Sequence, residues 1–269
     1  MASRTYAEML ALTNPVVEPA CREAIAALSL PEGSHGLDAG CGTGLQIPFL
    51  ARAAGRAGCI TGVDQNESFL AVARTYAAEW KVEATLRLQK GDVNHLPFVD
   101  DSFDWAWSSH CVGYRPDHSL AGLRELARVV RPGGTIALLF WSTQLLLPGY
   151  PELEAKLNGT PGGISPFTPG GDPEDHFLRT LHAFARVGLA ERRARAMVVD
   201  FHSPLTEELR TALAVIYDMV WEGAAQDVAG GERALFRSIT DPDSKDFLPD
   251  RDDYYGFIVY SLFSGRTEE

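Results

Sequence analysis

The sequence has little positive charge. Its 24 lysines and arginines stand against 36 aspartates and glutamates, which leaves a formal net charge of −12. A surface of that sign repels phosphate backbones and anionic lipid head groups, so it disfavours nucleic-acid binding and polybasic membrane attachment. We therefore expect no nucleic-acid partner.

Long apolar runs are also absent. The longest, such as 135–141 and 257–263, are far shorter than the roughly 20 residues needed to cross a bilayer. The N-terminal residues lack the basic segment and apolar core of a secretory signal. We expect no membrane span, no export and a cytoplasmic location.

Cysteine is scarce. The chain has Cys21, Cys41, Cys59 and Cys111, with neither C-x-x-C spacing nor a nearby histidine pattern of the zinc type. A disulfide framework is typical of short secreted chains rather than of a chain of this length. We expect reduced thiols and no metal site.

Strand-like and helix-like segments alternate through the first half of the sequence. Expected strands cover 34–39, 59–63, 86–89, 103–108 and 135–141, and expected helices cover 16–28, 45–54, 68–80 and 120–130. Such alternation is typical of parallel βαβ units, with helices on both faces of one sheet. The prediction is an α/β fold.

The pattern breaks after residue 141. Prolines and glycines crowd 148–173, which predicts a long loop or an irregular lid. A helix is expected from 205 to 221, between strands at 192–201 and 254–264. We therefore interpret 1–269 as one domain with a cofactor-binding core at 34–141. Two probable substrate-cap insertions cover 142–187 and 205–250.

These insertions are rich in aromatic side chains. The candidates are Phe167, Phe177, Phe184, Tyr217, Trp221 and Phe236. They predict either an enclosed, largely apolar acceptor cavity or simply the insertions' own core.

A glycine cluster joins the first strand to a helix, the place where α/β sheets bind nucleotide-like ligands. The run from Leu37 to Gly44 reads Leu-Asp-Ala-Gly-Cys-Gly-Thr-Gly, and Leu45 stands where the dinucleotide fingerprint G-x-G-x-x-G has its last glycine. Asp38 beside this loop would repel a phosphate but suits a cationic, ammonium-bearing ligand. A pyrophosphate site is therefore disfavoured.

Two further carboxylates end the next strands. Asp64 lies near the spacing expected for an acid that binds ribose hydroxyls. Asp92, in Gly91-Asp92-Val93, could accept from an adenine amino group. Each aspartate alone is most often a helix N-cap or a turn former. Their recurrence at three strand ends around one glycine loop favours a ligand site.

These motifs resemble those of the class I S-adenosylmethionine-dependent methyltransferases, especially the ubiquinone/menaquinone biosynthesis C-methyltransferase group. The carrying segments are 37–44, 62–64, 91–93 with Leu96-Pro97-Phe98, Ser102-Phe103-Asp104, and 126–134. The resemblance implies a Rossmann-like, seven-stranded, mostly parallel sheet whose last strand runs antiparallel. It also implies S-adenosylmethionine as cofactor and S-adenosylhomocysteine as product.

The resemblance implies particular cofactor contacts. The glycine loop would hold the methionine part, Asp64 the ribose and Asp92 the adenine. The full set of expected cofactor-binding residues is Asp38, Gly40, Cys41, Gly42, Gly44, Asp64, Gln65, Asp92, Val93 and Ser108.

Methyl transfer from a sulfonium is an in-line displacement, so alignment supplies much of the acceleration and a base is needed only for some acceptors. Residues just past the fourth strand would face the methyl group. His110 is the predicted base or acceptor-orienting group, and Tyr114 the second catalytic candidate. The alternatives are a structurally hydrogen-bonded histidine and a packed aromatic. Ser109 and Trp141 are the predicted substrate contacts.

The predicted function is methyl transfer to a small, partly apolar metabolite. Two alternatives stay open, a cofactor-binding scaffold without catalysis and a nicotinamide-dependent oxidoreductase, the second disfavoured by the glycine pattern. The sequence leaves the acceptor, the methylated atom and the oligomeric state open, a homodimer included.

Overall fold

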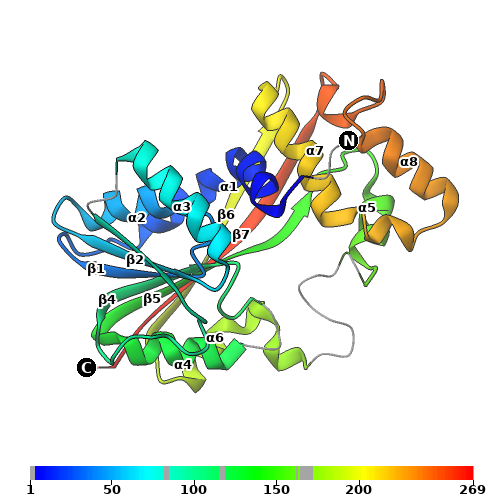
Figure 1. The fold of residues 1–269 in the computed structure, drawn as a ribbon. Helices are drawn as coiled ribbons and strands as arrows, with labels where there is room; N and C mark the ends of the chain where they lie inside the picture. Colours follow the sequence, from blue (N-terminus) through cyan, green and yellow to red (C-terminus); the bar gives the residue numbers. More distant parts are fainter. Residues whose placement is uncertain (1–3, 82–84, 115–118, 162, 164–171, 269) are drawn as a thin grey trace. The chain divides into compact units, whose positions relative to one another are not determined.

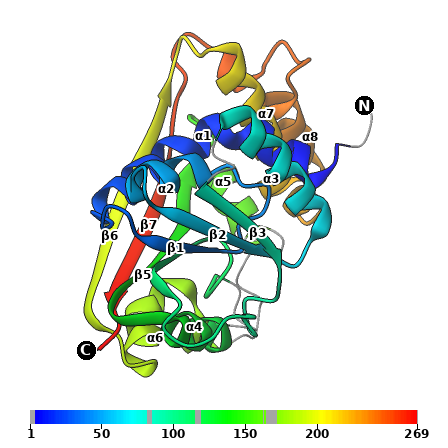
Figure 2. The same ribbon diagram turned by 60° about the vertical axis from the view of Figure 1, so that its left-hand side comes forward.

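Seven strands form one sheet in the order β3-β2-β1-β4-β5-β7-β6. The structure, a computed structural model, describes residues 4–81, 85–114, 119–161, 163 and 172–268. The strands are β1 (His35–Ala39), β2 (Cys59–Asp64), β3 (Leu86–Lys90), β4 (Phe103–Ser109), β5 (Val130–Leu145), β6 (Ala190–His202) and β7 (Tyr255–Arg266). Strands β1 to β5 pair in parallel, and Figure 2 shows β3 beyond β2 at one edge. The predicted Rossmann-like α/β sheet is confirmed.

Helices cover both faces of the parallel strands. Helices α2 (Ile47–Ala54) and α3 (Glu67–Trp80) lie on one face, and α4 (Ser119–Val129) and α6 (Thr180–Arg186) lie on the other (Figure 1). The remaining helices are α1 (Tyr6–Ala27), α5 (Pro151–Asn158), α7 (Glu207–Trp221) and α8 (Gly230–Thr240). This layering buries most residues of β1, β2 and β4, whereas the edge strand β3 is half-buried to exposed.

Strand β7 runs antiparallel to β5. Thr267, just past the end of β7, exchanges backbone hydrogen bonds with the start of β5: it accepts from Gly133 N–H and donates to Gly134 C=O, both over 3.1 Å. At the other end, Gly256 near the start of β7 lies beside the carbonyl of Leu145, the last residue of β5. The antiparallel last strand implied by the motifs is therefore present.

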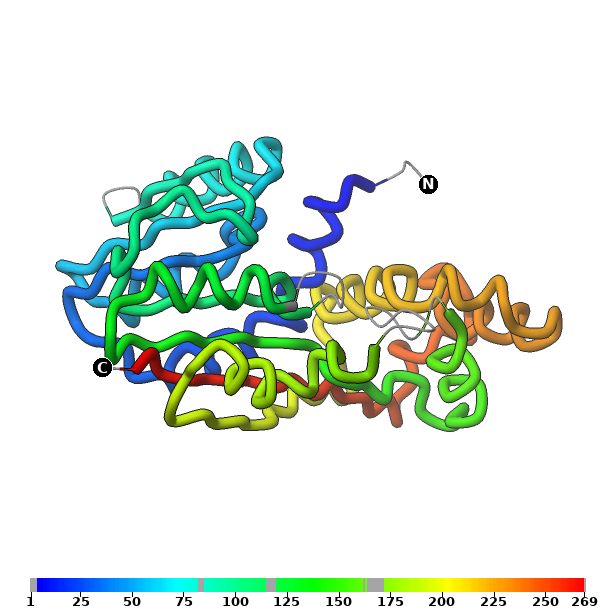
Figure 3. Tube along the Cα trace, turned by 90° about the horizontal axis from the view of Figure 1, so that it is seen from below, coloured from blue at the N-terminus to red at the C-terminus, as the bar shows by residue number. Residues whose placement is uncertain are grey.

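The chain divides into two compact units. Unit 1 comprises residues 1–19, 142–170 and 198–259, and unit 2 comprises 20–141, 171–197 and 260–269. Unit 2 holds the parallel strands and the glycine loop. Unit 1 holds α5, α7 and α8, and Figure 3 traces α7 into α8 in yellow and orange.

The proline- and glycine-rich stretch contains a helix that the sequence did not predict. Helix α5 begins at Pro151, where a missing N–H removes no intrahelical hydrogen bond. Its buried Glu154 accepts hydrogen bonds from the N–H groups of Leu146 (2.8 Å) and Leu147 (3.0 Å). Prolines at the helix start are therefore compatible with order here, and the prediction of an entirely irregular segment was wrong.

Several residues of the family motifs hold the frame of unit 2. The carboxylate of Asp104 accepts from His35 N–H over 2.6 Å and pairs with Arg131 over 2.9 Å, which joins the starts of β1 and β5 to β4. Arg128 on α4 donates to the carbonyl of Phe98 over 2.8 Å and pairs with Glu125 over 2.7 Å. These charged residues fasten the loop after β3 to α4, so their role in this structure is architectural.

Candidate functional site

The glycine loop turns sharply at the carboxyl end of β1. Its N–H groups at Gly40 and Cys41 both donate to the carbonyl of Val63, over 2.8 and 3.0 Å. Gly40, Gly42 and Gly44 all have positive φ, at +78°, +54° and +79°. Residues with a Cβ adopt this conformation only at a cost, so glycine is needed at each position.

The two first glycines differ in what surrounds them. A Cβ on Gly40 would lie within 2.6 Å of both Sγ and Cβ of Cys111. A Cβ on Gly42 would meet no atom of the described residues within 4 Å. Gly40 is therefore required by packing, whereas Gly42 leaves open space beside its backbone, where a ligand can approach.

Asp64 at the end of β2 fixes the apex of this loop. Its Oδ2 accepts from the N–H of Gly42 over 2.9 Å, and its Oδ1 accepts from the N–H of Asn66 over 2.8 Å. A carboxylate offers about four acceptor positions, so the remaining lone pairs suit ribose hydroxyls. Gln65, also predicted to bind the cofactor, is exposed.

Asp38 lies on β1 and is only 3% exposed. Burial and the nearby charge of Asp64 raise the pKa of its carboxyl to about 7. A cation placed beside it would favour the ionised form. This is the electrostatic setting predicted for an ammonium-bearing ligand.

Asp92 forms a turn after β3. Its exposed carboxylate accepts from the backbone N–H of Asn94 over 2.9 Å and from the Asn94 side-chain amide over 3.1 Å. Val93 is partly buried against the hydrophobic core. The turn-forming alternative therefore describes Asp92 in this structure, and its contact with adenine stays a prediction.

Ser108 connects β4 to the glycine loop. Its buried hydroxyl donates to the carbonyl of Ala39 over 2.7 Å and accepts from the N–H of Val112 over 3.1 Å. Both contacts are to the backbone, so Ser108 links the start of the glycine loop to the segment that follows β4.

His110 follows β4 with both ring nitrogens engaged. Its Nε2 accepts from the N–H of Trp141 over 2.8 Å, and its Nδ1 lies 2.8 Å from the hydroxyl of Ser109. Because Nε2 accepts, the proton of the neutral ring is on Nδ1 and donates to Ser109. Burial lowers the pKa of the imidazole to about 4. This geometry favours the hydrogen-bonded, structural alternative over a free general base.

The predicted aromatic residues lie next to His110. Tyr114 contacts the His110 ring at 5.3 Å between centroids and stacks on Phe140 at 5.4 Å. Trp141 on β5 contacts Tyr260 on β7 at 5.8 Å. His110, which directly follows β4, thus contacts both Tyr114 and the backbone of Trp141, four residues before the end of β5.

Tyr260 was missed by the sequence reasoning. Its ring lies 6.1 Å from that of His110, and its hydroxyl is buried. Strand β7 is far from the family motifs in the sequence, and an apolar run containing a tyrosine carries no functional signal. Only the strand order places it here.

Other predictions have mixed outcomes. Phe177 and Phe184 pack in the hydrophobic core of unit 2, and Tyr217, Trp221 and Phe236 are buried within unit 1. Phe167 lies outside the described residues.

Burial raises the pKa of the Cys41 thiol, and it raises that of Cys111 to about 12, so neither is an activated nucleophile.

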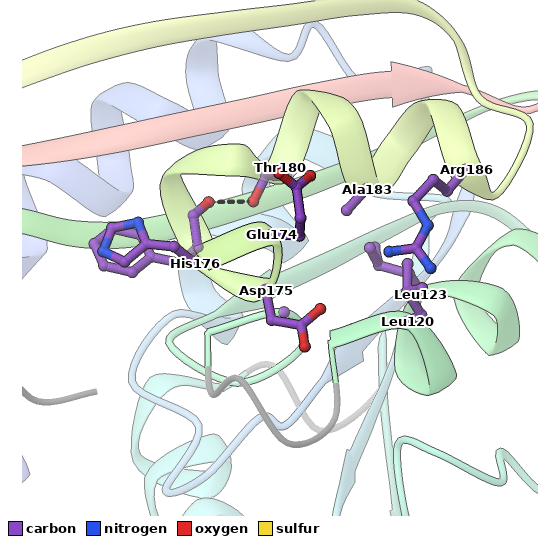
Figure 4. Close-up of a pocket in the computed structure, with 10 residues that line it drawn as sticks. Leu120, Leu123, Glu174, Asp175, His176, Thr180, Ala183 and Arg186 are labelled. Atoms are coloured by element: carbon purple, nitrogen blue, oxygen red, sulfur yellow. Dashed lines mark hydrogen bonds between the residues drawn. The ribbon is translucent and has the colours of Figure 1, made fainter. Parts of the chain in front are cut away.

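A small pocket also opens beside α4 and α6 in unit 2 (Figure 4). It is lined by Leu120, Leu123, Asp175, Thr180 and Arg186, among others. Its volume is about 10 Å³, the room of one water molecule, so it is too small for a metabolite.

The described residues contain neither a metal-binding cluster nor a helix suited to cross a membrane. No group of three or more His, Cys, Asp or Glu side chains is placed to hold a metal ion. In the same part of the chain, no helix has the length and apolar character to cross a membrane.

Comparison with known proteins agrees with this geometry. Residues 37–134 match the family described as "Methyltransferase domain". Methyltransferase GfsG of Streptomyces halstedii is 36% identical over 111 residues, which are 41% of this chain and 39% of that protein. Demethylmenaquinone methyltransferase of Staphylococcus aureus is 34% identical over 128 residues, which are 48% of this chain and 51% of that protein. The matched part thus spans about half or less of these curated relatives.

A solved structure resembles nearly the whole chain. Geranyl diphosphate C-methyltransferase from Streptomyces coelicolor has a TM-score of 0.54 at 15% identity, with 99% of this chain and 85% of that chain covered. This likeness shows the fold. The family match shows that residues 37–134 form a methyltransferase domain, in agreement with the resemblance drawn from the motifs.

Proposed function

We propose that the protein transfers a methyl group from S-adenosylmethionine to a small, partly apolar metabolite. The observation that carries the proposal is the glycine loop, whose apex N–H is held by Asp64 and whose Gly42 has open space beside it. The curated relatives, which include a demethylmenaquinone methyltransferase, support the same activity.

The residues around the loop fit the cofactor chemically. Asp38 offers a buried carboxyl for an ammonium group, and Asp64 retains acceptor positions for ribose hydroxyls. Gly42 adds no side chain on the side where the ligand would approach. When bound, S-adenosylmethionine supplies an electrophilic methyl group on a sulfonium.

The residues past β4 would position the acceptor. His110 has both nitrogens in hydrogen bonds and a lowered pKa, so we assign it the orienting role, acting through Ser109 and the backbone of Trp141. Alignment of acceptor and methyl group can supply most of the acceleration without a base. An acceptor that loses a proton would pass it to another group or to water.

Acceptor choice is proposed to come from the insertions at 142–187 and 205–250. The core at 37–134 matches a general methyltransferase domain, so it carries the shared chemistry rather than the substrate selection. A small-molecule acceptor agrees with the acidic surface. The cytoplasmic location of the protein stays a prediction.

Isothermal titration with S-adenosylmethionine tests the cofactor site. Asp64→Ala and Gly42→Val should weaken binding severely, whereas Asp200→Ala, at an exposed position on β6, should bind as the wild type does. If both Asp64→Ala and Gly42→Val bind S-adenosylmethionine with wild-type affinity, the proposed cofactor site is wrong.

Activity is tested separately with a labelled methyl group. Incubation with demethylmenaquinol, geranyl diphosphate and then a metabolite extract should yield a labelled product. Binding of the cofactor without any labelled product would favour the scaffold alternative instead.

A further inference from the structure

Tyr260 has a buried hydroxyl without a hydrogen-bond partner. Among the described residues, only two buried side-chain oxygens or nitrogens are in this position, Asn94 Oδ1 and the Tyr260 hydroxyl. Tyr260 is fully buried. Leaving a buried polar group unpaired is costly, so such a group in a folded protein requires an explanation, and a ligand that supplies the missing partner is one.

The Tyr260 ring lies among residues of the predicted methyl-transfer region. Strand β7, which holds Tyr260, lies next to β5, which holds Trp141, and β5 lies next to β4, which His110 directly follows. The Tyr260 ring contacts Trp141 at 5.8 Å and His110 at 6.1 Å. Both neighbours belong to the predicted methyl-transfer region.

Tyr260 differs from His110 in what it can still bind. Both nitrogens of His110 are occupied, by the Trp141 N–H and by Ser109. The Tyr260 O–H has its full capacity left among the described residues.

We propose that Tyr260 positions the methyl acceptor by donating a hydrogen bond to an oxygen atom of that acceptor. The inference rests on the proposed function and adds a substrate class to it. The acceptor would therefore carry an oxygen atom within reach of this hydroxyl, beside the ring of Trp141. Trp141, which contacts the Tyr260 ring, is partly exposed, and its backbone N–H donates to His110.

The hydroxyl acts as a donor rather than a base. Burial raises the pKa of Tyr260 well above its ordinary value of 10, so it keeps its proton throughout the neutral range.

The test compares two probes that differ by one oxygen, 1-naphthol and naphthalene, on protein saturated with S-adenosylhomocysteine. Equilibrium dialysis gives the ratio of their affinities in wild type and in Tyr260→Phe. We expect this ratio to fall by about three- to tenfold in the variant, the effect of one hydrogen bond, with naphthalene binding unchanged. Equal ratios in the two proteins, including no retention of either probe, would overturn the proposal.

Thermal unfolding supplies the structural control. Tyr217→Phe removes a buried hydroxyl that is partnered, 3.1 Å from both the Leu146 carbonyl and the Tyr254 hydroxyl, so its Tm should fall. Tyr260→Phe should leave Tm unchanged or raise it. A fall as large as that of Tyr217→Phe would show a structural partner and overturn the proposal.

The cofactor separates this inference from the proposed function. Wild-type protein that binds no S-adenosylhomocysteine contradicts the proposed function itself. Normal cofactor affinity with equal probe ratios contradicts only the role of Tyr260.

Discussion

The backbone N–H of Trp141 donates a hydrogen bond to Nε2 of His110 across 2.8 Å. This bond joins the loop after β4 to β5 and uses the lone pair that a general base would need. With Nδ1 held by Ser109, the imidazole links two strands at the edge where the cofactor loop lies.

The stability of the protein should depend on pH through His110. Burial lowers the pKa of the folded imidazole to about 4, below the 6.5 of an unfolded histidine. The folded state therefore binds fewer protons between these values, so the histidine's contribution rises with pH from about 4 to 6.5 and is lost on acidification. Urea unfolding of wild type and His110→Asn should show a difference that shrinks as pH falls through this window. Asparagine tolerates the positive φ of +53° at this position.

Turnover gives a second reading of the same residue. Because this pKa lies near 4, His110→Ala should lower turnover without changing the shape of the pH–rate profile above pH 5. An acidic limb near pH 6–7 that disappears in the variant would restore the general-base role.

Cofactor affinity should increase with pH because of Asp38. Its pKa of about 7 means that the carboxyl is largely protonated below neutrality, and a cationic ligand must displace that proton. The Kd for S-adenosylmethionine should fall as pH rises from 6 to 8, by up to about tenfold per unit below the pKa. Calorimetry in buffers of different ionisation enthalpy should detect the released proton. Asp38→Asn should bind more weakly with a flat profile, while exposed Asp200→Asn keeps the wild-type slope.

The loop glycines should separate stability from binding. Gly42→Ala places its Cβ in open space, so the free energy of unfolding should fall only by the positive-φ strain, about 1–2 kcal/mol. The same variant should weaken cofactor binding at least tenfold. Gly188→Ala is the matched control, since Gly188 also has positive φ, +79°, and open space among the described residues. It should show the same loss of stability with normal affinity. Gly40→Ala, which collides with Cys111, should be the least stable of the three. Equal cofactor affinity in the Gly42 and Gly188 variants would refute the assignment of Gly42 to the cofactor site.

The buried carboxyl of Glu154 should contribute a pH dependence to unit 1. Burial raises its pKa above the ordinary 4.5, although the N–H groups of Leu146 and Leu147 partly oppose this. The folded state thus holds the proton to higher pH, and the stability advantage of wild type over Glu154→Gln should shrink as pH rises above 4.5. Circular dichroism during urea unfolding at pH 4 to 7 measures it. Glu152→Gln, on the exposed face of α5, should change stability by less than about 0.5 kcal/mol at each pH. A constant difference for Glu154→Gln would contradict the pKa assignment.

Much of the fold followed from local sequence. The alternation of apolar segments placed β1 to β4 within one or two residues of their observed ends, because helix and strand periodicities are local properties. Strand β5 was predicted too short, at 135–141 against Val130–Leu145, because its outer parts are stabilised by pairing rather than by composition. Helix α5 was missed because the prolines and glycines dominate the composition of this stretch, and composition does not show that Glu154 accepts from the N–H groups of Leu146 and Leu147.

By itself the sequence determined the glycine loop and the carboxylates at the ends of β1, β2 and β3, since chain connectivity alone carries each strand end into its turn. Tertiary structure decided what those groups do. His110 and Trp141 are 31 positions apart in the sequence and meet only in the folded sheet. Only the fold also places β7 beside β5. The hydrogen bonds of the His110 nitrogens and the unpartnered hydroxyl of Tyr260 therefore depend on which segments of the fold meet. No local sequence pattern encodes that.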